Sequence, residues 1–492
     1  MITENNKSCA VVGSGVAGLG AAIRMRNRGY KVTIFESNSF PGGKMSSETN
    51  KGYRFDYGPS VFTLPMIVDD LFVISGKNPR DYFNYSHLDP VFRFFFEDGT
   101  VLDSPHGRKA YAKYMASKTS DSEETILKFL ERTETIYNLT GELFMMNSLH
   151  KAKNYFKKSV AKGIFNFGKI GAFDTMHSAN EKAFTDKKLI QMFDRYATYN
   201  GSSPYVVPAT LNVIPYVEID LGAFYPEGGM HSITTSLVKL AEEIGITIKL
   251  STPVKEIVVE NKKATGIKSK DGFEKFDIVI SNADVYNTYQ HLMPEAKKPK
   301  KVLSQPKSSS GIVFYWGIKK EFKELEIHNL FYGSNYFEEF DAIVNKQTIY
   351  EDPTVYINIT SKLTPTDAPA GCENWFTFVN VPYNSGQDWD KLVNEMRENI
   401  IKKLNRILKT DIRPLIECEM VMDPRVIEQR TSSAFGAIYG NASNSMFAAF
   451  FRHPNFSKDI KNLYFCGGSV HPGPGIPMCL LSAQIATGLI ED

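Results

Sequence analysis

The sequence predicts an α/β protein organised around a dinucleotide-binding βαβ unit, with a second, β-sheet domain and a helical cap. Three observations lead to this fold class. Glycine-rich turns lie near both ends of the chain, and each falls between an apolar run and a helical pattern. Residues 311–377 contain β-rich runs, and residues 122–177 have a helical pattern. Because both glycine turns adjoin a strand and a helix, we expect them to serve one cofactor domain.

The N-terminal unit begins with the apolar run Ser8–Val12 and ends at Glu36. Between them, Gly13-Ser14-Gly15-Val16-Ala17-Gly18 opens an Ala-rich helix. This spacing is typical of a dinucleotide fingerprint, in which glycines permit a tight turn and bring the helix N-terminus close to a pyrophosphate. Glu36 can accept hydrogen bonds from ribose hydroxyls. The residues expected at the cofactor are Gly13, Gly15, Val16, Ala17, Gly18, Glu36 and Ser37.

Length and composition set the broad class. A chain of 492 residues is expected to form two or three domains. The net charge of +2 predicts no nucleic-acid partner. Five scattered cysteines without metal-ligand spacing favour a reducing cytoplasm and predict no metal site. Since no leader and no membrane-spanning apolar run is found, we expect a cytoplasmic protein that touches a membrane only from its surface.

Two further turns follow the βαβ unit and favour a flavin over a nicotinamide cofactor. The first is Phe40-Pro41-Gly42-Gly43-Lys44, and the second ends in Gly58-Pro59-Ser60. A nicotinamide dehydrogenase would continue into more βα units, whereas here the pattern leaves the sheet. The residues expected at the cofactor in these turns are Gly43, Lys44, Gly58, Pro59 and Ser60.

The C-terminal segment contains the second strong signal. A buried strand is predicted over 462–466, a loop with four glycines and three prolines over 467–477, and an apolar helix over 478–490. An elongated ligand such as FAD can contact both glycine turns at once, and a helix N-terminus stabilises anionic reduced flavin. The residues expected at the cofactor here are Gly467, Gly468, Ser469, Gly475, Ile476, Pro477 and Met478.

The middle of the chain predicts several further elements. Helices are expected over 232–244 and 389–408, and short strands over 254–259 and 264–268. Residues 276–283 form an apolar run typical of a third parallel strand. The β-rich runs 312–316, 354–359 and 375–381 predict a sheet on the substrate side.

A basic amphipathic helix is expected over Leu149–Phe173. Its apolar stripe is Leu149, Ala152, Phe156, Val160, Ile164 and Phe167, and lysines project from the opposite face. Such a helix suits an anionic membrane surface. The periodicity alone leaves open a cap helix packed on the core with a solvated lysine face.

Together these motifs resemble the bacterial phytoene desaturase family of FAD-dependent carotenoid desaturases, over essentially the full length. The resemblance is carried by the N-terminal fingerprint through Pro59, Tyr225–Met230, Ser281–Asp284 and Cys466–Ala483. It implies FAD, a Rossmann-like FAD-binding domain of the glutathione-reductase or amine-oxidase flavoprotein type, and further FAD contacts at Val254 and Asn282. Met478-Cys479 stands where this family usually has Gly-Val. That departure and the segment Asp194–Pro204 look like the hydroxycarotenoid 3,4-desaturase branch.

The implied substrate is a carotenoid with a tertiary hydroxyl at C1, acyclic or with one ring. Hydride loss from C4 to flavin and proton loss from C3 would create the new double bond, with oxygen or a quinone as final electron acceptor. The intermediate cation makes the C3 proton acidic, so no strong base is required, and no catalytic residue is assigned. His231 and His471 are candidate bases by location only. Arg195 and Tyr199 are expected to meet the C1 hydroxyl.

Because a carotenoid is insoluble in water, its tunnel is expected to open onto the bilayer, near Leu149–Phe173. The predicted domains are an FAD-binding domain (1–70, 222–290 and 460–492), a substrate domain (291–459 with part of 71–221) and a helical, membrane-facing cap (120–200). Alternatives that remain open are a phytoene- or lycopene-type desaturase, a redox-neutral carotenoid isomerase, an amine or protoporphyrinogen oxidase, and a catalytically silent flavin-containing membrane adaptor.

Overall fold

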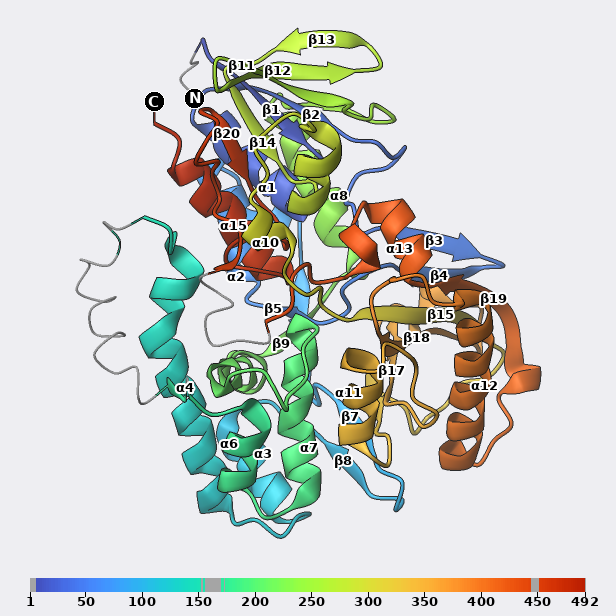
Figure 1. Cartoon of the computed structure of the whole chain (residues 1–492). Helices are drawn as coiled ribbons and strands as arrows, with labels where there is room; N and C mark the ends of the chain where they lie inside the picture. Colours follow the sequence, from blue (N-terminus) through green and yellow to red (C-terminus); the bar gives the residue numbers. More distant parts are fainter. Residues whose placement is uncertain (1–5, 152–153, 155–169, 172, 444–450, 492) are drawn as a thin grey trace.

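A five-stranded parallel sheet forms the upper part of the molecule (Figure 1). The computed structural model describes residues 6–151, 154, 170–171, 173–443 and 451–491. The sheet has the order β10-β2-β1-β14-β20, and every neighbouring pair is parallel. Its strands are β1 (Ser8–Val12), β2 (Lys31–Phe35), β10 (Thr247–Lys249), β14 (Ile278–Ser281) and β20 (Leu463–Phe465). Segments from both ends and the middle of the chain therefore build one layer, with β14 between the N-terminal and C-terminal strands.

Helices pack against this sheet and against one another. They are α1 (Val16–Asn27), α2 (Met66–Ile74), α8 (His231–Glu243) and α15 (Ile476–Gly488). A Cβ on Gly20 would lie 2.8 Å from Leu480 Cδ2, so a glycine lets α1 and α15 approach closely. The predicted βαβ unit, third parallel strand and C-terminal strand and helix are confirmed, although α15 begins two residues before the expected Met478.

Three smaller sheets complete the upper and middle parts. The strands β11 (Glu256–Glu260), β12 (Lys263–Ser269) and β13 (Gly272–Lys275) form an antiparallel sheet, of which β11 and β12 were expected and β13 was not. The other two are the hairpin β3 (Ser47–Asn50) and β4 (Tyr53–Asp56), and the sheet of β5 (Phe62–Thr63), β9 (Ala223–Pro226) and β6 (Tyr85–His87).

A seven-stranded mixed sheet, of order β19-β15-β18-β17-β16-β7-β8, forms the lower right of Figure 1. Its strands are β7 (Arg93–Phe95), β8 (Val101–Asp103), β15 (Ser310–Ile318), β16 (His328–Phe331), β17 (Val355–Ile359), β18 (Glu373–Val381) and β19 (Ile416–Met422). The predicted β-rich runs are confirmed as β15, β17 and β18. The predicted helix 389–408 is α12 (Trp389–Leu408), whose apolar side packs on one face of this sheet. The short helices α11 (Tyr336–Val344) and α13 (Pro424–Thr431) lie beside this sheet. The short helices α9 (Val285–Asn287) and α10 (Lys300–Leu303) instead pack on the apolar cluster of the parallel sheet.

The helical region at the lower left consists of α3 (Arg108–Ala116), α4 (Glu123–Met146), α6 (Met176–Ala183) and α7 (Lys187–Asp194). Ser122 caps α4 as its side chain accepts a hydrogen bond from Thr125 N. The expected helical run does not continue through Asn147, because its backbone is extended and its side chain bonds the carbonyl of Glu142. Most of the expected amphipathic stretch Leu149–Phe173 lies outside the described residues.

A buried carboxyl gives the substrate-side sheet a pH-dependent stability. Glu339 is 2% exposed, and burial raises its pKa to about 7, partly opposed by hydrogen bonds from Thr354 and the charge of Lys403. The folded protein therefore holds this proton more tightly than the unfolded chain does. The Glu339 contribution to the free energy of unfolding falls as pH rises from about 4.5 to about 7, and is lowest above that range.

We expect Glu339→Gln to raise the free energy of unfolding at pH 8 by about 1–3 kcal/mol and to change it little at pH 4.5. The substitution keeps the shape of the side chain but removes the buried charge. Urea titrations at both pH values measure the difference. Glu338→Gln, at a partly exposed neighbour, is the control; equal effects of Glu339→Gln at the two pH values would contradict the assignment.

Candidate active site

The glycine fingerprint has the geometry of a close-approach turn. Gly13 has φ +95°, and its N–H donates to Phe35 O at 2.8 Å, which ties the turn to the end of β2. A Cβ on Gly18 would lie 2.1 Å from Gly13 O, so α1 can begin here only with glycine. Gly15 is the N-cap of α1 and supplies no side-chain cap. The N-terminus of α1, with its positive dipole end, is therefore not blocked by a capping side chain.

Asn282 joins the two glycine-rich turns. A Cβ on Gly15 would lie 2.8 Å from Asn282 Oδ1, and a Cβ on Gly467 would lie 2.7 Å from Asn282 Nδ2. The same amide nitrogen donates to Cys466 O at 3.1 Å. Four predicted cofactor residues, Gly15, Gly18, Asn282 and Gly467, are thus brought together at the carboxyl ends of the parallel strands, where ligands of such sheets bind.

Glu36 lies at the end of β2 and is 4% exposed. Its Oε2 accepts hydrogen bonds from Ser14 N at 2.9 Å and Ser14 Oγ at 2.7 Å, and its Oε1 accepts one from Asn38 N at 2.9 Å. Ser37 Oγ lies 3.2 Å from Oε1. These four donors occupy the acceptor positions of the carboxylate and fix it beside the fingerprint, so a ribose hydroxyl would have to replace one of the serine hydroxyls. Val254 packs on the apolar cluster that contains Val12 and Phe35, the last residues of β1 and β2.

The turns after the βαβ unit fold back onto the fingerprint. Gly42 forms a bridge with Gly15, and a Cβ on Gly43 would lie 3.3 Å from Gly15 Cα. Lys44 Nζ donates to Ile438 O at 2.8 Å. The Lys44 side chain is exposed, yet burial lowers its pKa, partly opposed by Asp284 and Cys479.

The remaining predicted residues of these turns are held by the same framework. Gly58 has φ +90°, a Cβ there would lie 2.2 Å from Lys44 O, and Pro59 follows it. Ser469 Oγ accepts a hydrogen bond from Val285 N at 3.0 Å. Gly475 is the N-cap of α15 and has φ +101°. The other residues, at their predicted places in the first turns of α1 and α15 or beside Gly467, are Val16, Ala17, Gly468, Ile476, Pro477 and Met478.

The two candidate bases, His471 and His231, each make a hydrogen bond within the protein. His471 is buried, its Nε2 donates to Asn147 O at 2.8 Å, and burial lowers its pKa to about 4. His231 Nδ1 lies 3.0 Å from Ser47 Oγ, and burial lowers its pKa as well. Both imidazoles are therefore neutral at pH 7. A weakly basic site is compatible with a reaction in which the proton is lost from a carbocation.

Arg195 and Tyr199 lie in one buried cluster, as their i, i+4 spacing suggests. Arg195 Nη2 donates to Glu218 Oε1 at 2.7 Å, and Arg195 Nη1 to Tyr199 Oη at 3.1 Å. The hydroxyls of Tyr196 and Tyr199 both donate to Glu218, which sits in a π-helical turn over Tyr216–Asp220. Burial by itself lowers the pKa of Arg195, but the carboxylate of Glu218 holds it well above its usual value.

Glu218 could not be found from the sequence, because neither its spacing from Arg195 nor a motif connects the two. An aromatic surface lies beside this cluster. The guanidinium carbon of Arg195 is 4.3 Å from the Phe92 ring and 5.5 Å from the Phe94 ring. His328 stacks on Phe92, with ring centroids 5.1 Å apart. Arg195 is therefore a buried cation over aromatic faces, neutralised by one carboxylate.

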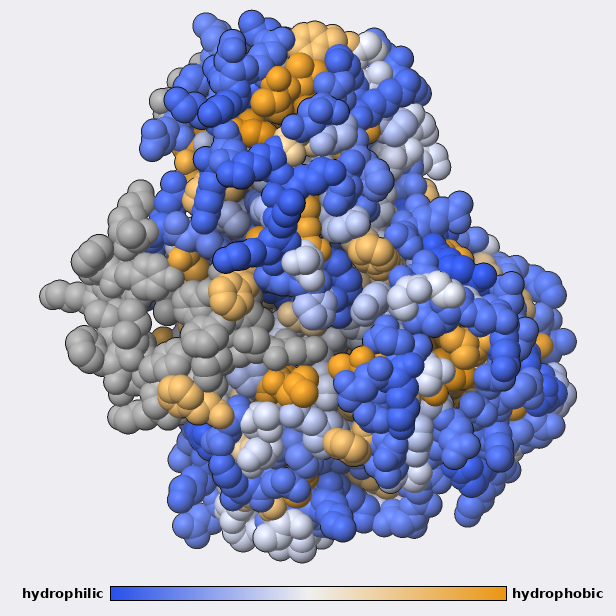
Figure 2. All heavy atoms as spheres, in the orientation of Figure 1, coloured by the Kyte–Doolittle hydropathy of each residue, from blue (hydrophilic) through white to orange (hydrophobic). Residues whose placement is uncertain are grey.

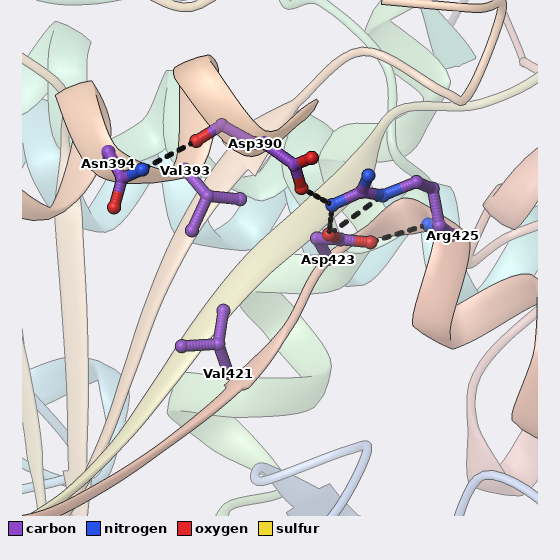
Figure 3. Close-up of a pocket in the computed structure, with 6 residues that line it drawn as sticks. All are labelled: Asp390, Val393, Asn394, Val421, Asp423 and Arg425. Atoms are coloured by element: carbon purple, nitrogen blue, oxygen red, sulfur yellow. Dashed lines mark hydrogen bonds and ion pairs between the residues drawn. The ribbon is translucent and has the colours of Figure 1, made fainter. Parts of the chain in front are cut away.

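A shallow pocket on the outer side of the molecule is separate from these residues. Figure 3 shows it between α12, β19 and the start of α13, with a volume of about 350 Å³. Arg425 donates to Asp390 at 2.7 Å and to Asp423 at 2.8 Å across it. None of the predicted site residues lines this pocket.

The parallel sheet, with two glycine-rich turns meeting at Asn282, defines a dinucleotide-binding protein, since the open glycine cradles fit a pyrophosphate and would be filled by any Cβ. The chain belongs to the family of flavin-containing amine oxidoreductases, whose family model matches residues 16–490. The cofactor and enzyme class expected from the sequence are thereby confirmed: the protein is a flavin-dependent oxidoreductase.

Two curated relatives show which members of this family the chain resembles. A 1-hydroxycarotenoid 3,4-desaturase from Flavobacterium sp. is 47% identical over 486 residues, covering 99% of each chain. A 4,4'-diapolycopene oxygenase from Methylomonas sp. is 32% identical, covering 99% of this chain and 98% of the relative. The resemblance to carotenoid desaturases is confirmed. Among solved structures, a putrescine oxidase variant aligns with a TM-score of 0.63 at 13% identity, over 98% of each chain, which shows the amine-oxidase fold alone.

We expect Gly15→Ala to reduce the flavin affinity by tenfold or more, since its Cβ would enter the space beside Asn282 and the pyrophosphate. Flavin absorbance of the purified protein and titration of the apoprotein with FAD measure the loss. Gly488→Ala, whose Cβ would meet nothing within 4 Å, is the matched control. Unchanged flavin affinity in Gly15→Ala would remove this turn from the cofactor site.

Proposed function

We propose that the protein is an FAD-dependent carotenoid desaturase that introduces a C3=C4 double bond into a 1-hydroxylated carotenoid. The observation that carries this proposal is the 47% identity, over 99% of both chains, to a 1-hydroxycarotenoid 3,4-desaturase. FAD, held between the two glycine turns, supplies the hydride acceptor. The predicted contacts from Gly13 to Ser60, Val254, Asn282 and Gly467 to Met478 hold it. Oxygen or a quinone is the final electron acceptor.

The chain contributes positioning and a dry environment to this reaction. Loss of a hydride from C4 and of a proton from C3 leaves a neutral polyene with one more double bond. The positive charge in between is spread over the conjugated chain, so aromatic faces along the chain can stabilise it through cation–π contacts, and exclusion of water protects it from attack by water. The aromatic side chains Phe92, Phe94 and Tyr356 of the substrate-side sheet lie in the cluster that supports this role.

The polar cluster offers a partner for the C1 hydroxyl. A hydroxyl brought into an apolar tunnel without a hydrogen bond costs about 1–3 kcal/mol. Arg195 and Tyr199 are polar groups beside the aromatic surface, and Tyr199 is only partly buried. We infer that this end of the site receives the hydroxylated end of the carotenoid. A site that hydrogen-bonds a hydroxyl also discriminates against substrates that lack one.

In this proposal the carotenoid enters the protein from the cytoplasmic surface of a membrane. Among the described residues no helix has the length and apolarity to span a bilayer. Exposed apolar side chains support a peripheral contact: Met66 and Val73 of α2 are 54% and 60% exposed, and Phe173 is 76% exposed. Figure 2 shows apolar patches bordering the segment drawn in grey. Lysines of the 149–173 stretch would meet anionic lipid, and a helical cap would cover the tunnel mouth.

Purified protein in liposomes should desaturate a 1-hydroxylated carotene and leave its hydroxyl-free counterpart largely unchanged. The longer polyene absorbs at longer wavelength, so a red shift confined to the hydroxylated substrate is the expected result, with the product mass two hydrogens lower. Equal turnover of both carotenes, desaturation of phytoene alone, or a product of unchanged mass would contradict the proposal; the last outcome would indicate an isomerase.

Replacing Lys158, Lys162 and Lys169 by Gln should weaken binding to anionic vesicles by tenfold or more, since each basic residue near such a surface contributes about 1 kcal/mol. Vesicle flotation at two salt concentrations measures the effect. The control replaces Lys255, Lys262 and Lys270, which are exposed around the β11–β13 sheet. A loss of the same size in both variants would mean that charge alone, and not this segment, binds the membrane.

A further inference from the structure

Buried polar atoms without a hydrogen-bond partner gather around the Phe92–Phe94 aromatic surface. In the part of the chain that the structure describes, they are Arg195 Nε, His328 Nε2 and Tyr332 Oη. Arg195 is 4% exposed and His328 and Tyr332 are each 1% exposed. An unpaired buried donor is costly in a folded protein, so three beside one aromatic surface point to a missing oxygen-bearing partner.

The protonation of His328 follows from its neighbours. Asn358 Nδ2 donates to Ile327 O at 3.0 Å, which fixes the orientation of the amide. Its second hydrogen points to His328 Nδ1, 3.1 Å away. We assign the tautomer in which Nδ1 accepts this hydrogen bond and Nε2 carries the hydrogen, with the Tyr356 hydroxyl hydrogen turned toward Nδ1. Burial, with the charge of Arg195 adding to it, lowers the pKa of His328 to about 3. His328 is thus a neutral ring with one unused N–H donor.

A hydrogen-bond chain connects His328 to the predicted cofactor loop. Tyr356 Oη lies 2.7 Å from His328 Nδ1 and 2.9 Å from Ser60 Oγ. Ser60 follows Gly58 and Pro59, where the flavin contact is expected. In the proposed substrate the hydroxyl and the carbon that loses the hydride are separated by only three carbon–carbon bonds. The group that binds the hydroxyl must therefore lie a side chain or two from the flavin, and His328 meets this requirement if Ser60 contacts the flavin as predicted.

We propose that His328 is a specificity-determining residue whose Nε2–H donates to the oxygen on C1 of the substrate, on an aromatic surface shared with Arg195. This inference rests on the proposed function. The substrate hydroxyl would break no existing hydrogen bond of His328, because Asn358 and Tyr356 both contact Nδ1 and leave Nε2 without a partner. Glu218 acts as a positioning residue, because it neutralises Arg195 and orients Tyr199. A carotenoid end without oxygen would leave the His328 donor unpaired.

The test compares kcat/KM for a 1-hydroxylated carotene and its hydroxyl-free counterpart. His328→Phe keeps a ring against Phe92 but removes the donor, and should lower the ratio of the two values by about 10- to 100-fold. His328→Gln, which restores an N–H donor, should recover most of the ratio. The matched control is Thr377→Val, which removes another unpaired buried hydroxyl, on the α12 side of the same sheet, and should leave the ratio unchanged.

An unchanged ratio in a folded, flavin-loaded His328→Phe protein would overturn the inference while leaving the desaturase function intact. Wild-type protein that desaturates neither carotene would instead refute the proposed function. A measurement on the wild type covers the case in which His328→Phe does not fold. The Nε2–H resonance of ¹⁵N-labelled histidine should shift with the hydroxylated carotene only; no shift, or the same shift with both carotenes, would overturn the inference.

Discussion

The close approach of two glycine-rich turns at Asn282 is the constraint on which the rest of the structure depends. Any Cβ at Gly15 or Gly467 would press against the Asn282 amide, at 2.8 and 2.7 Å. The contact brings the first and last parts of the chain into one parallel sheet, with β14 between them. Because both ends are fixed in this way, the intervening residues make two long excursions from the sheet and return to it. The helical region with β7 and β8 is built before β10, and the other strands of the substrate-side sheet are built after β14.

The sequence predicted the strands and helices of the parallel sheet well because they are built from local patterns. Gly13, Gly15 and Gly18 fall within six residues, and their spacing follows directly from a turn that enters a helix. The predicted strands and α12 are likewise short runs of one periodicity. Asn147 shows the limit: its side chain and extended backbone end α4, although the surrounding pattern favours helix. At this position a hydrogen bond from a side chain to the backbone outweighs the helical periodicity of the sequence.

The polar end of the site could not be predicted in the same way. Arg195 and Tyr199 share a helix-like spacing, but Glu218 reaches them from a π-helical turn. Ser60, His328 and Tyr356 come from three distant segments and meet only because β16 and β17 are adjacent in the sheet. Such contacts depend on strand order and register, and single-sequence patterns carry neither. The parallel pairing of β7 with β16 is a further example.

The distribution of charge in this site agrees with the chemistry of a polyene. The imidazoles of His231, His328 and His471 all have pKa values lowered by burial, so none is a strong base near neutral pH. Arg195, the buried cation, is matched by Glu218, which prevents its charge from opposing a positive polyene. A strong base is not required, because the proton that leaves a delocalised cation is already acidic. In the proposed reaction, selectivity would then depend on the position of neutral hydrogen-bond donors, and the unpartnered atoms His328 Nε2 and Tyr332 Oη lie beside the Phe92–Phe94 aromatic surface.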